Sequence, residues 1–257
     1  MINKIHNEDC LDTMARMPDD FIDLTITSPP YDNLRTYDGY LFDFERTAKE
    51  LYRVTKQGGV CVWVVGDATI NGSETGNSFR QAIGFLNIGF NLFDTMIYAK
   101  PPRGAVGNNK SYWQTFEYMF VLSKNKIKKI NLICDRKNKE SRDGDKGTKR
   151  TKSGELKNVS RSGYGTTGRR TNIWQYNTGK GHSTKDKIAF DHPAIFPEQL
   201  ANDHVVSWSD EGDLVYDPFA GSGTTLKMAL LNRRNFIGSE VSSEYCQIAN
   251  QRIGESK

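Results

Sequence analysis

The sequence predicts an α/β fold with a doubly wound, mostly parallel sheet and helices on both of its faces. Strand-like and helix-like segments alternate at both ends of the chain, as they do when crossover helices join parallel strands. The segment VCVWVV (60–65) is apolar throughout, which is typical of a strand covered on both sides. A polar, basic stretch interrupts the alternation, so the 257 residues are expected to form one large domain with an insertion.

The elements of the first half follow from the spacing of apolar residues. Phe44, Ala48 and Leu51 recur at helical intervals, and Gly58 and Gly59 are expected to end that helix. Short apolar or β-branched runs predict the strands. The expected strands are 22–27, 60–65, 93–99 and 115–123, and the expected helices are 44–59 and 78–90.

The second half resumes the alternation after the interruption. Pro197 suits the first turn of a helix over 196–208, where a backbone N–H has no partner within the helix. The elements expected after it are strands 213–217 and 235–240 and helices 224–234 and 243–253.

Charge is distributed unevenly along the chain. Residues 124–187 hold 19 Lys and Arg against 6 Asp and Glu, whereas the remainder holds 16 against 25, so the net charge of +4 conceals a basic segment. A basic segment on an acidic body favours a polyanionic partner such as nucleic acid. A solvated, disordered loop has the same composition, and charge alone does not separate the two.

The four cysteines are far apart and form no CxxC pair, so neither a metal site nor a disulfide framework is indicated. Reduced thiols favour a cytoplasmic protein. The start of the chain, MINKIHNEDC (1–10), lacks the apolar run of a signal peptide. No apolar stretch approaches the length of a membrane span, so no membrane partner is expected.

A glycine turn, DPFAGSGTT (217–225), joins a predicted strand to the next helix. Gly221 and Gly223 permit a tight turn and a close backbone approach to a ligand, and Asp217 at the strand end is placed to reach a positively charged group. Glu240 follows Gly221 by 19 residues, the spacing at which a carboxylate takes the ribose hydroxyls of a nucleotide. A plain β–α connection is the alternative, and the absence of GKT or GKS argues against a triphosphate-binding loop.

A second unusual stretch, TSPPY (27–31), follows the first predicted strand. Its two prolines make a stiff backbone without N–H donors, which offers carbonyl oxygens, the Ser28 hydroxyl and the Tyr31 ring. Alone, a Pro-Pro pair most often only turns the chain at a strand end.

Together, TSPPY and DPFAGSGTT resemble the S-adenosylmethionine-dependent DNA amino-methyltransferases, in which [DNS]PP[YFW] marks the catalytic loop and FxGxG the cofactor loop. The order of the two motifs resembles the β class of that family. The resemblance implies a Rossmann-like class I methyltransferase fold with a circularly permuted motif order. It further implies a catalytic half (1–123), a basic target-recognition region (124–187) and a cofactor-binding half (188–257).

The chemistry of this family gives the Pro-Pro loop a purpose. A methyl group moves from a sulfonium to an exocyclic amine whose lone pair is delocalised into the base. The Ser28 hydroxyl and the Pro29 carbonyl can accept hydrogen bonds from that amine and stabilise its developing charge, and Tyr31 can stack on a base that has left the duplex. The catalytic residues implied are Ser28, Pro29, Pro30 and Tyr31, without metal or covalent nucleophile.

The resemblance also implies a set of cofactor-binding residues. Asp9 lies in NEDCLDTM, a segment similar to one in which the Asp would accept a hydrogen bond from the adenine amino group, with Cys10 beside it. Glu8 replaces the usual Gly, and a helix N-cap is the alternative for Asp9. HPAIFPEQL (192–200) resembles the segment that closes over the methionine end of the cofactor. The implied residues are Asp9, Cys10, His192, Pro193, Phe196, Asp217, Phe219, Gly221, Ser222, Gly223, Thr224 and Glu240.

Ser28 at the first motif position resembles the cytosine-N4 enzymes, with adenine N6 as the alternative. Carbon-5 methylation is disfavoured because it needs a cysteine nucleophile, usually after a proline, and none of the four cysteines follows one. An RNA or protein methyltransferase and a non-catalytic DNA-binding protein remain rival hypotheses.

Double-stranded DNA is the expected macromolecular partner, and a second copy of the chain and a cognate restriction endonuclease are compatible further partners. Lysines and arginines of the basic segment would mainly contact phosphates. The candidate nucleic-acid contacts are Lys149, Arg150, Lys152, Arg161, Arg169, Arg170 and Trp174.

Overall fold

The computed structural model describes residues 1–30, 42–101, 112–138, 144–161, 163, 165–192, 195 and 197–256. The chain forms two compact units. The larger unit comprises Met1–Asn131 and Asn172–Lys257, and the smaller unit comprises Leu132–Thr171.

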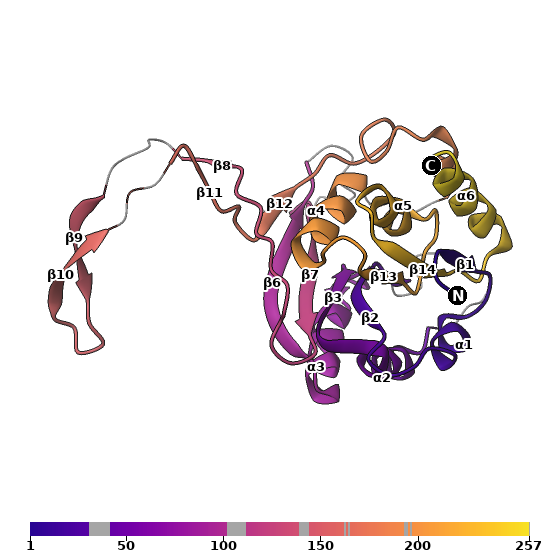
Figure 1. Cartoon of the computed structure of the whole chain (residues 1–257), viewed down its shortest axis with the longest axis horizontal. Helices are drawn as coiled ribbons and strands as arrows, with labels where there is room; N and C mark the ends of the chain where they lie inside the picture. The colour runs from indigo at the N-terminus through magenta and orange to yellow at the C-terminus, as the bar shows by residue number, and fades with distance from the viewer. Residues whose placement is uncertain are drawn as a thin grey trace. The chain divides into compact units, whose positions relative to one another are not determined.

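An eight-stranded sheet forms the centre of the larger unit (Figure 1). In spatial order its strands are β1 (Lys4–His6), β14 (Asn235–Ser239), β13 (Leu214–Asp217), β2 (Ile22–Thr27), β3 (Thr55–Val65), β7 (Phe116–Ser123), β6 (Asn91–Ala99) and β12 (Ile173–Gln175). Every neighbouring pair is parallel except the two that involve β7. The predicted mostly parallel sheet is therefore confirmed.

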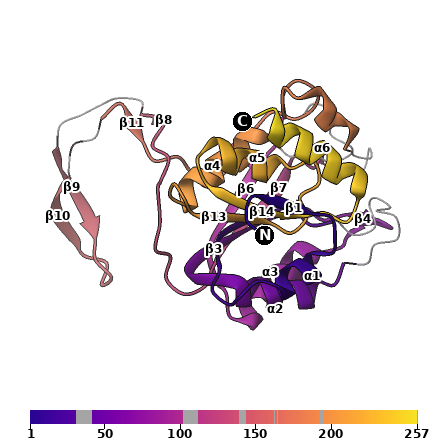
Figure 2. The same cartoon turned by 45° about the vertical axis from the view of Figure 1, so that its right-hand side comes forward.

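Helices cover both faces of this sheet (Figure 2). On one face lie α1 (Cys10–Ala15), α2 (Phe44–Val54) and α3 (Asn77–Ile88). On the other face lie α4 (Glu198–Trp208), α5 (Thr224–Leu231) and α6 (Ser243–Gly254). A 3₁₀ helix, η1 (Lys187–Asp191), and a short hairpin of β4 (Thr69–Ile70) and β5 (Ser73–Glu74) complete the unit. No helix in the described ranges is long and apolar enough to cross a membrane.

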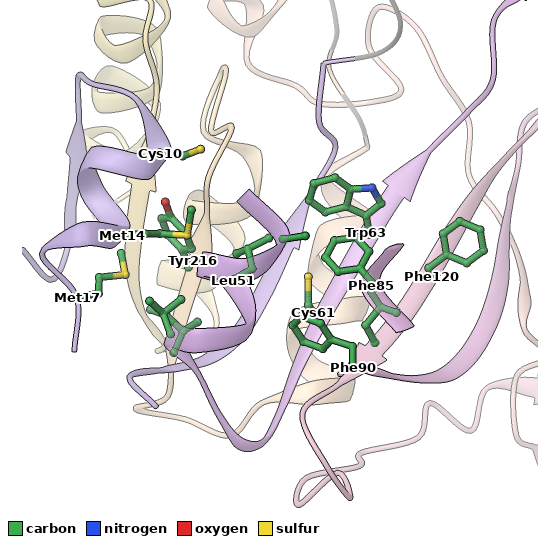
Figure 3. Packing of buried hydrophobic residues seen from close by; sticks show 14 of the residues in the cluster. Cys10, Met14, Met17, Leu51, Cys61, Trp63, Phe85, Phe90, Phe120 and Tyr216 are labelled. Atoms are coloured by element: carbon green, nitrogen blue, oxygen red, sulfur yellow. The ribbon is translucent and has the colours of Figure 1, made fainter. Parts of the chain in front are cut away.

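The core beneath the first face links α1, α2 and α3 to the sheet (Figure 3). Trp63 of β3 and Phe85 of α3 are fully buried with their rings edge to face, 5.0 Å between centroids. Tyr216 of β13 and Met14 of α1 extend the same cluster. Edge-to-face aromatic pairs add directional contacts to the burial of apolar surface, so the strands that end at the candidate site rest on a rigid base.

Two parts of the first half differ from expectation. The strand β1 and the helix α1 were not predicted, since each is short and carries little periodic pattern. The helix expected over 44–59 ends at Val54, and Gly58 and Gly59 lie inside β3 instead of after the helix. They pair with the end of β7: the Gly58 amide donates to the Lys124 carbonyl at 2.6 Å, and the Lys124 amide donates to the Gly59 carbonyl at 3.1 Å.

The smaller unit consists of two antiparallel strand pairs. A hairpin joins β9 (Asp145–Arg150) to β10 (Leu156–Arg161), and β8 (Arg136–Lys137) pairs with β11 (Thr167–Gly168). This unit is shorter than the basic segment 124–187, because residues 172–187 belong to the larger unit, where β12 joins the sheet. None of these strands was predicted, since Gly, Ser, Thr, Lys and Arg give no hydrophobic alternation.

Candidate functional site

The strand order reverses direction between β2 and β13. From β2 the chain runs through α2 to β3 on one side, and from β13 it runs through α5 to β14 on the other. The two strands are parallel neighbours, with Val215 opposite Leu24 and Tyr216 opposite Thr25. Ligands of open α/β sheets bind outside the carboxyl ends of the strands at such a switch point.

Both sequence motifs begin at this switch point. TSPPY starts at the end of β2 and DPFAGSGTT at the end of β13. The hydroxyl of Thr27 donates to Asp217 Oδ1 at 2.7 Å, and the hydroxyl of Thr225 donates to the Ile26 carbonyl at 3.2 Å. All four residues are buried, so the starts of the two loops are fixed side by side.

The Pro-Pro loop is partly covered where it leaves the sheet. Pro29 is buried, and Ser28 and Pro30 are half-buried. The stiff dipeptide therefore starts from a fixed strand end, as its suggested role requires. Tyr31 lies outside the described residues.

Asp217 is more enclosed than its position at a strand end suggested. The side chain is 1% exposed, and its Oδ1 accepts both the Thr27 hydroxyl and the Phe219 amide, the latter at 3.1 Å. Burial raises the pKa of this carboxyl to about 6, against the opposing effect of its hydrogen bonds. The carboxylate thus ties the glycine turn to β2, which is a different task from reaching out to a cation.

The glycine turn has a backbone that other residues would strain. Gly221 and Gly223 have φ values of 49° and 77°, in the left-handed region. A Cβ on Gly221 would lie 2.9 Å from His192 Nε2, and one on Gly223 would lie 2.8 Å from the Cβ of Ala249. The Gly223 amide also closes the turn by donating to the Ala220 carbonyl at 2.7 Å. Both glycines are therefore required by conformation and by space.

Glu240 lies directly against this turn. Its two carboxylate oxygens accept the backbone amides of Gly221 and Ser242, at 2.8 and 2.9 Å. Burial raises the pKa of Glu240, while these backbone hydrogen bonds act in the other direction. The spacing of 19 residues read from the sequence thus corresponds to a direct contact between the carboxylate and the glycine turn.

The structure describes six more of the residues that were expected to bind the cofactor, and each has its own surroundings. Asp9 caps α1 by accepting the Leu11 amide at 2.7 Å, so the N-cap alternative describes this carboxylate. Cys10 is buried in the core, and the His192 ring packs on Tyr245, 4.3 Å between centroids. Phe219 is half-buried, whereas Ser222 and Thr224 are buried. Pro193 and Phe196 lie outside the described residues.

A buried ion-pair network below the turn was not found from the sequence. Arg252 of α6 is 1% exposed and donates to Asp186 at 2.9 Å and to Glu198 at 2.8 Å. Lys227 of α5 donates to the same two carboxylates, at 2.6 and 2.7 Å. Arg252 also donates to the Ser222 carbonyl, so the network holds the glycine turn from beneath. Charged residues on otherwise apolar faces of α5 and α6 were the available signal.

The expected nucleic-acid contacts fall into three groups. Lys149, Arg150 and Lys152 are exposed on the β9–β10 hairpin, and Arg161 belongs to β10, although its side chain is outside the description. Arg169 is exposed, whereas Arg170 pairs with Asp135 and thereby lowers the pKa of that carboxyl.

Trp174 requires a correction. It is 6% exposed in β12 and packs against the buried His204, 4.7 Å between ring centroids. Trp174 is therefore a core residue of the larger unit and offers no open face for a base. Within the described residues, no group of three or more His, Cys, Asp or Glu side chains could hold a metal ion.

A glycine turn with an adjoining carboxylate and a Pro-Pro loop share the switch point of a doubly wound sheet, which defines a class I methyltransferase architecture. The solved PvuII DNA methyltransferase (cytosine-N4-specific) has the same fold, with a TM-score of 0.71 and 20% identity over 96% of this chain and 85% of that one. TTHA0409 of Thermus thermophilus, titled a putative DNA modification methylase, was solved with S-adenosyl-L-methionine. It matches with a TM-score of 0.67 and 23% identity over 99% of this chain and 94% of that one.

Sequence comparison identifies the family. Residues 22–251 match the N6/N4 DNA methylase family. The orphan methyltransferase M.BamHII of Bacillus amyloliquefaciens is 59% identical over 235 residues, covering 90% of this chain and 88% of that protein. The chain belongs to the N6/N4 DNA methylase family and is a DNA methyltransferase. This confirms the resemblance inferred from the two motifs. It also confirms S-adenosylmethionine as the family's methyl donor, with which TTHA0409 was solved.

Proposed function

We propose that the protein transfers a methyl group from S-adenosylmethionine to the N4 amine of cytosine at a specific site in double-stranded DNA. The observation that carries the proposal is the 2.7 Å hydrogen bond between Thr27 and Asp217. It fixes the strand ends from which the Pro-Pro loop and the glycine turn start, so a base held by one loop meets a donor held by the other. The activity would belong to restriction–modification in the cytoplasm of a bacterium or phage host.

The residues at the glycine turn fit this cofactor. Gly221 and Gly223 leave the turn without side chains, so a nucleoside can approach its backbone. The Glu240 carboxylate, already oriented by two amides, suits the ribose hydroxyls. Asp217 keeps the turn attached to the strand that carries the catalytic loop. When bound, the cofactor supplies an electrophilic methyl group on a sulfonium.

The Pro-Pro loop would act on the accepting amine. The Ser28 hydroxyl and the Pro29 carbonyl accept hydrogen bonds from the NH₂ group, which favours a pyramidal nitrogen with an available lone pair. A nitrogen–carbon bond forms as the sulfur–carbon bond breaks, and the positive charge that develops on the amine is stabilised by these two oxygens. The surplus proton then leaves the amine for water. The prolines keep both acceptors in place beforehand, so little reorganisation is needed.

Ser28 favours cytosine over adenine as the target base, because serine at this motif position resembles the cytosine-N4 enzymes. The smaller unit, with 12 Lys and Arg against 5 Asp and Glu over residues 132–171, would position the duplex. A second copy of the chain and a cognate endonuclease would be further partners. None of the four cysteines forms a disulfide, in keeping with a reducing cytoplasm.

The test is transfer of a labelled methyl group. The purified protein is incubated with tritiated S-adenosylmethionine and separately with duplex DNA, RNA and a protein mixture, and labelled DNA is digested to nucleosides for mass analysis. N4-methylcytosine is expected from DNA, and Ser28→Ala is expected to lose transfer while cofactor affinity persists. N6-methyladenine would replace the cytosine assignment with its alternative, and labelled RNA beside unlabelled DNA would overturn the proposal.

A further inference from the structure

The β9–β10 hairpin is a two-stranded antiparallel ribbon (Figure 1). Residues 145–161 include six Lys and Arg and two Asp and Glu. Apart from the half-buried Gly147, Thr151 and Val159, the described side chains of the ribbon are exposed. An isolated hairpin without a hydrophobic face is marginally stable in water, so we expect a partner surface to order it.

One face of the ribbon places like charges opposite each other. Lys149 and Lys157 are register partners, and the next pair on that face, Gly147 and Val159, offers neither a counter-charge nor a hydrogen-bonding side chain. Like charges directly opposite on neighbouring strands repel and destabilise the pair. A polyanion between or beside the two ammonium groups removes that penalty, which makes this pair a signal for phosphate rather than for an apolar or cationic partner.

The other face carries groups that can identify bases. Thr148 and Asn158 are register partners, and the neighbouring pairs on this face are Arg150 with Leu156 and Lys146 with Ser160. An Asn amide can bind adenine through N6 and N7, Arg can bind guanine through O6 and N7, and hydroxyls bind either donors or acceptors. This face therefore holds the Thr148 and Asn158 side chains that suit base edges, with a basic residue on either side of them, whereas the opposite face pairs Lys149 with Lys157, which suits phosphates.

We propose that this ribbon enters the major groove of duplex DNA, with the Thr148–Asn158 face on the base edges and Lys149 and Lys157 on the flanking phosphates. The inference rests on the proposed function and adds how the target sequence is read. The major groove is about 12 Å wide and about 8.5 Å deep, and it admits two strands about 4.8 Å apart. The lysines of the outer face then emerge at the height of the phosphates, within reach of their long side chains.

The test separates the two faces. Sequencing of DNA modified by the wild type defines the methylated sequence, and duplexes of about 30 base pairs are made with and without it. Binding is measured against salt concentration in the presence of S-adenosylhomocysteine. The variants are Lys149→Gln/Lys157→Gln and Thr148→Ala/Asn158→Ala, and the control, Lys4→Gln/Lys49→Gln, removes the same charge from exposed positions of the larger unit. Cofactor affinity and melting temperature verify folding.

We expect the lysine pair to lower the salt slope by about 1.8 for both duplexes, with their affinity ratio unchanged. The Thr148/Asn158 pair should leave the slope intact and reduce the ratio by at least about tenfold. Three outcomes would overturn the proposal. The lysine variant could show the same salt slope as the control, or the Thr148→Ala/Asn158→Ala variant could lose affinity equally for both duplexes. The third outcome is that the ribbon binds RNA in place of duplex DNA. Failure of the wild type to methylate DNA would instead refute the proposed function. The salt slopes of the lysine pair and its control could still be compared on any duplex, because that binding is measured without transfer.

Discussion

Replacement of Arg252 by Met should destabilise the larger unit and weaken cofactor binding together. The side chain is 1% exposed, and Arg252→Met leaves the Asp186 and Glu198 carboxylates to share Lys227. Asp186 and Glu198 keep Lys227, and their side chains are 24% and 21% exposed, so neither carboxylate is left as a fully buried, unpaired charge. The expected cost is that of losing hydrogen bonds to a charged group, about 1.5–3 kcal/mol. In a protein of this size each kcal/mol shifts the melting temperature by roughly 2–4 °C, so a fall of about 3–12 °C is expected.

The cofactor effect follows from a different bond of the same side chain. Arg252 Nη1 donates to the Ser222 carbonyl in the glycine turn and, at 3.2 Å, to the Thr224 hydroxyl at the start of α5. A hydrogen bond to a charged group contributes about 1.5–3 kcal/mol, so its loss should raise the cofactor Kd by at least about tenfold. Arg252→Lys keeps the charge without the planar fork and should fall between wild type and Met.

Thermal unfolding by circular dichroism and cofactor titration by calorimetry measure the two effects. Lys49→Met is the matched control, since it removes a cation from an ion pair with Glu45 in which both side chains are more than half exposed. This control should move the melting temperature by no more than about 2 °C. Equal melting of Arg252→Met and the control would refute the stability argument. A lower melting temperature with unchanged cofactor Kd would refute the link to the turn.

Three further predictions concern the site itself. Burial gives Asp217 a folded pKa of about 6, above its unfolded value, so the stability that its neutral form contributes below pH 4 is lost as the pH rises through 6. The free energy of unfolding of Asp217→Asn should therefore rise relative to that of the wild type, by about 3 kcal/mol between pH 4 and 7.5. A difference in melting temperature that does not change with pH would contradict this. Asp217→Ala should weaken the cofactor in calorimetry, whereas Ser28→Ala should abolish transfer alone; equal losses of affinity would show that the division of roles is wrong. Gly221→Ala, whose Cβ would crowd His192, should raise the cofactor Kd and lower the melting temperature, and an unchanged Kd would argue against the turn as the binding surface.

Much of this fold was available from the sequence because its signals are local. The apolar runs at 22–27 and 60–65 and the helical spacing of Phe44, Ala48 and Leu51 depend on neighbours a few residues away. The limit of helix α2 was harder to place, because Gly58 and Gly59 serve as partners for β7, about 65 residues later, and not as a helix stop. A sequence pattern shows that glycine is required at a position, but not which strand approaches it.

The two loops of the candidate site could be predicted because their motifs are local. The residues that hold these loops from distant parts of the chain could not. The order of the two motifs placed both loops at strand ends, and the spacing from Gly221 to Glu240 predicted a carboxylate at the turn, which accepts the Gly221 amide. The network of Arg252 was missed, since its partners Asp186 and Glu198 are 66 and 54 positions away. Trp174 was misassigned because its basic neighbours suggested an open surface, whereas its neighbours in space are those of the core.

The positions of these charges indicate how the two halves of the site are kept in register. Asp217 links the glycine turn to β2, the strand that ends just before Ser28, through the hydroxyl of Thr27. Arg252 of α6 holds the next part of the same turn by donating to the Ser222 carbonyl. Because the turn is fixed at one point to the catalytic strand and at another to α6, it cannot shift along the sheet without breaking a buried polar contact. In the proposed transfer, a base held by one loop and a methyl donor held by the other would have to be aligned, and these two contacts would supply the rigidity for that alignment.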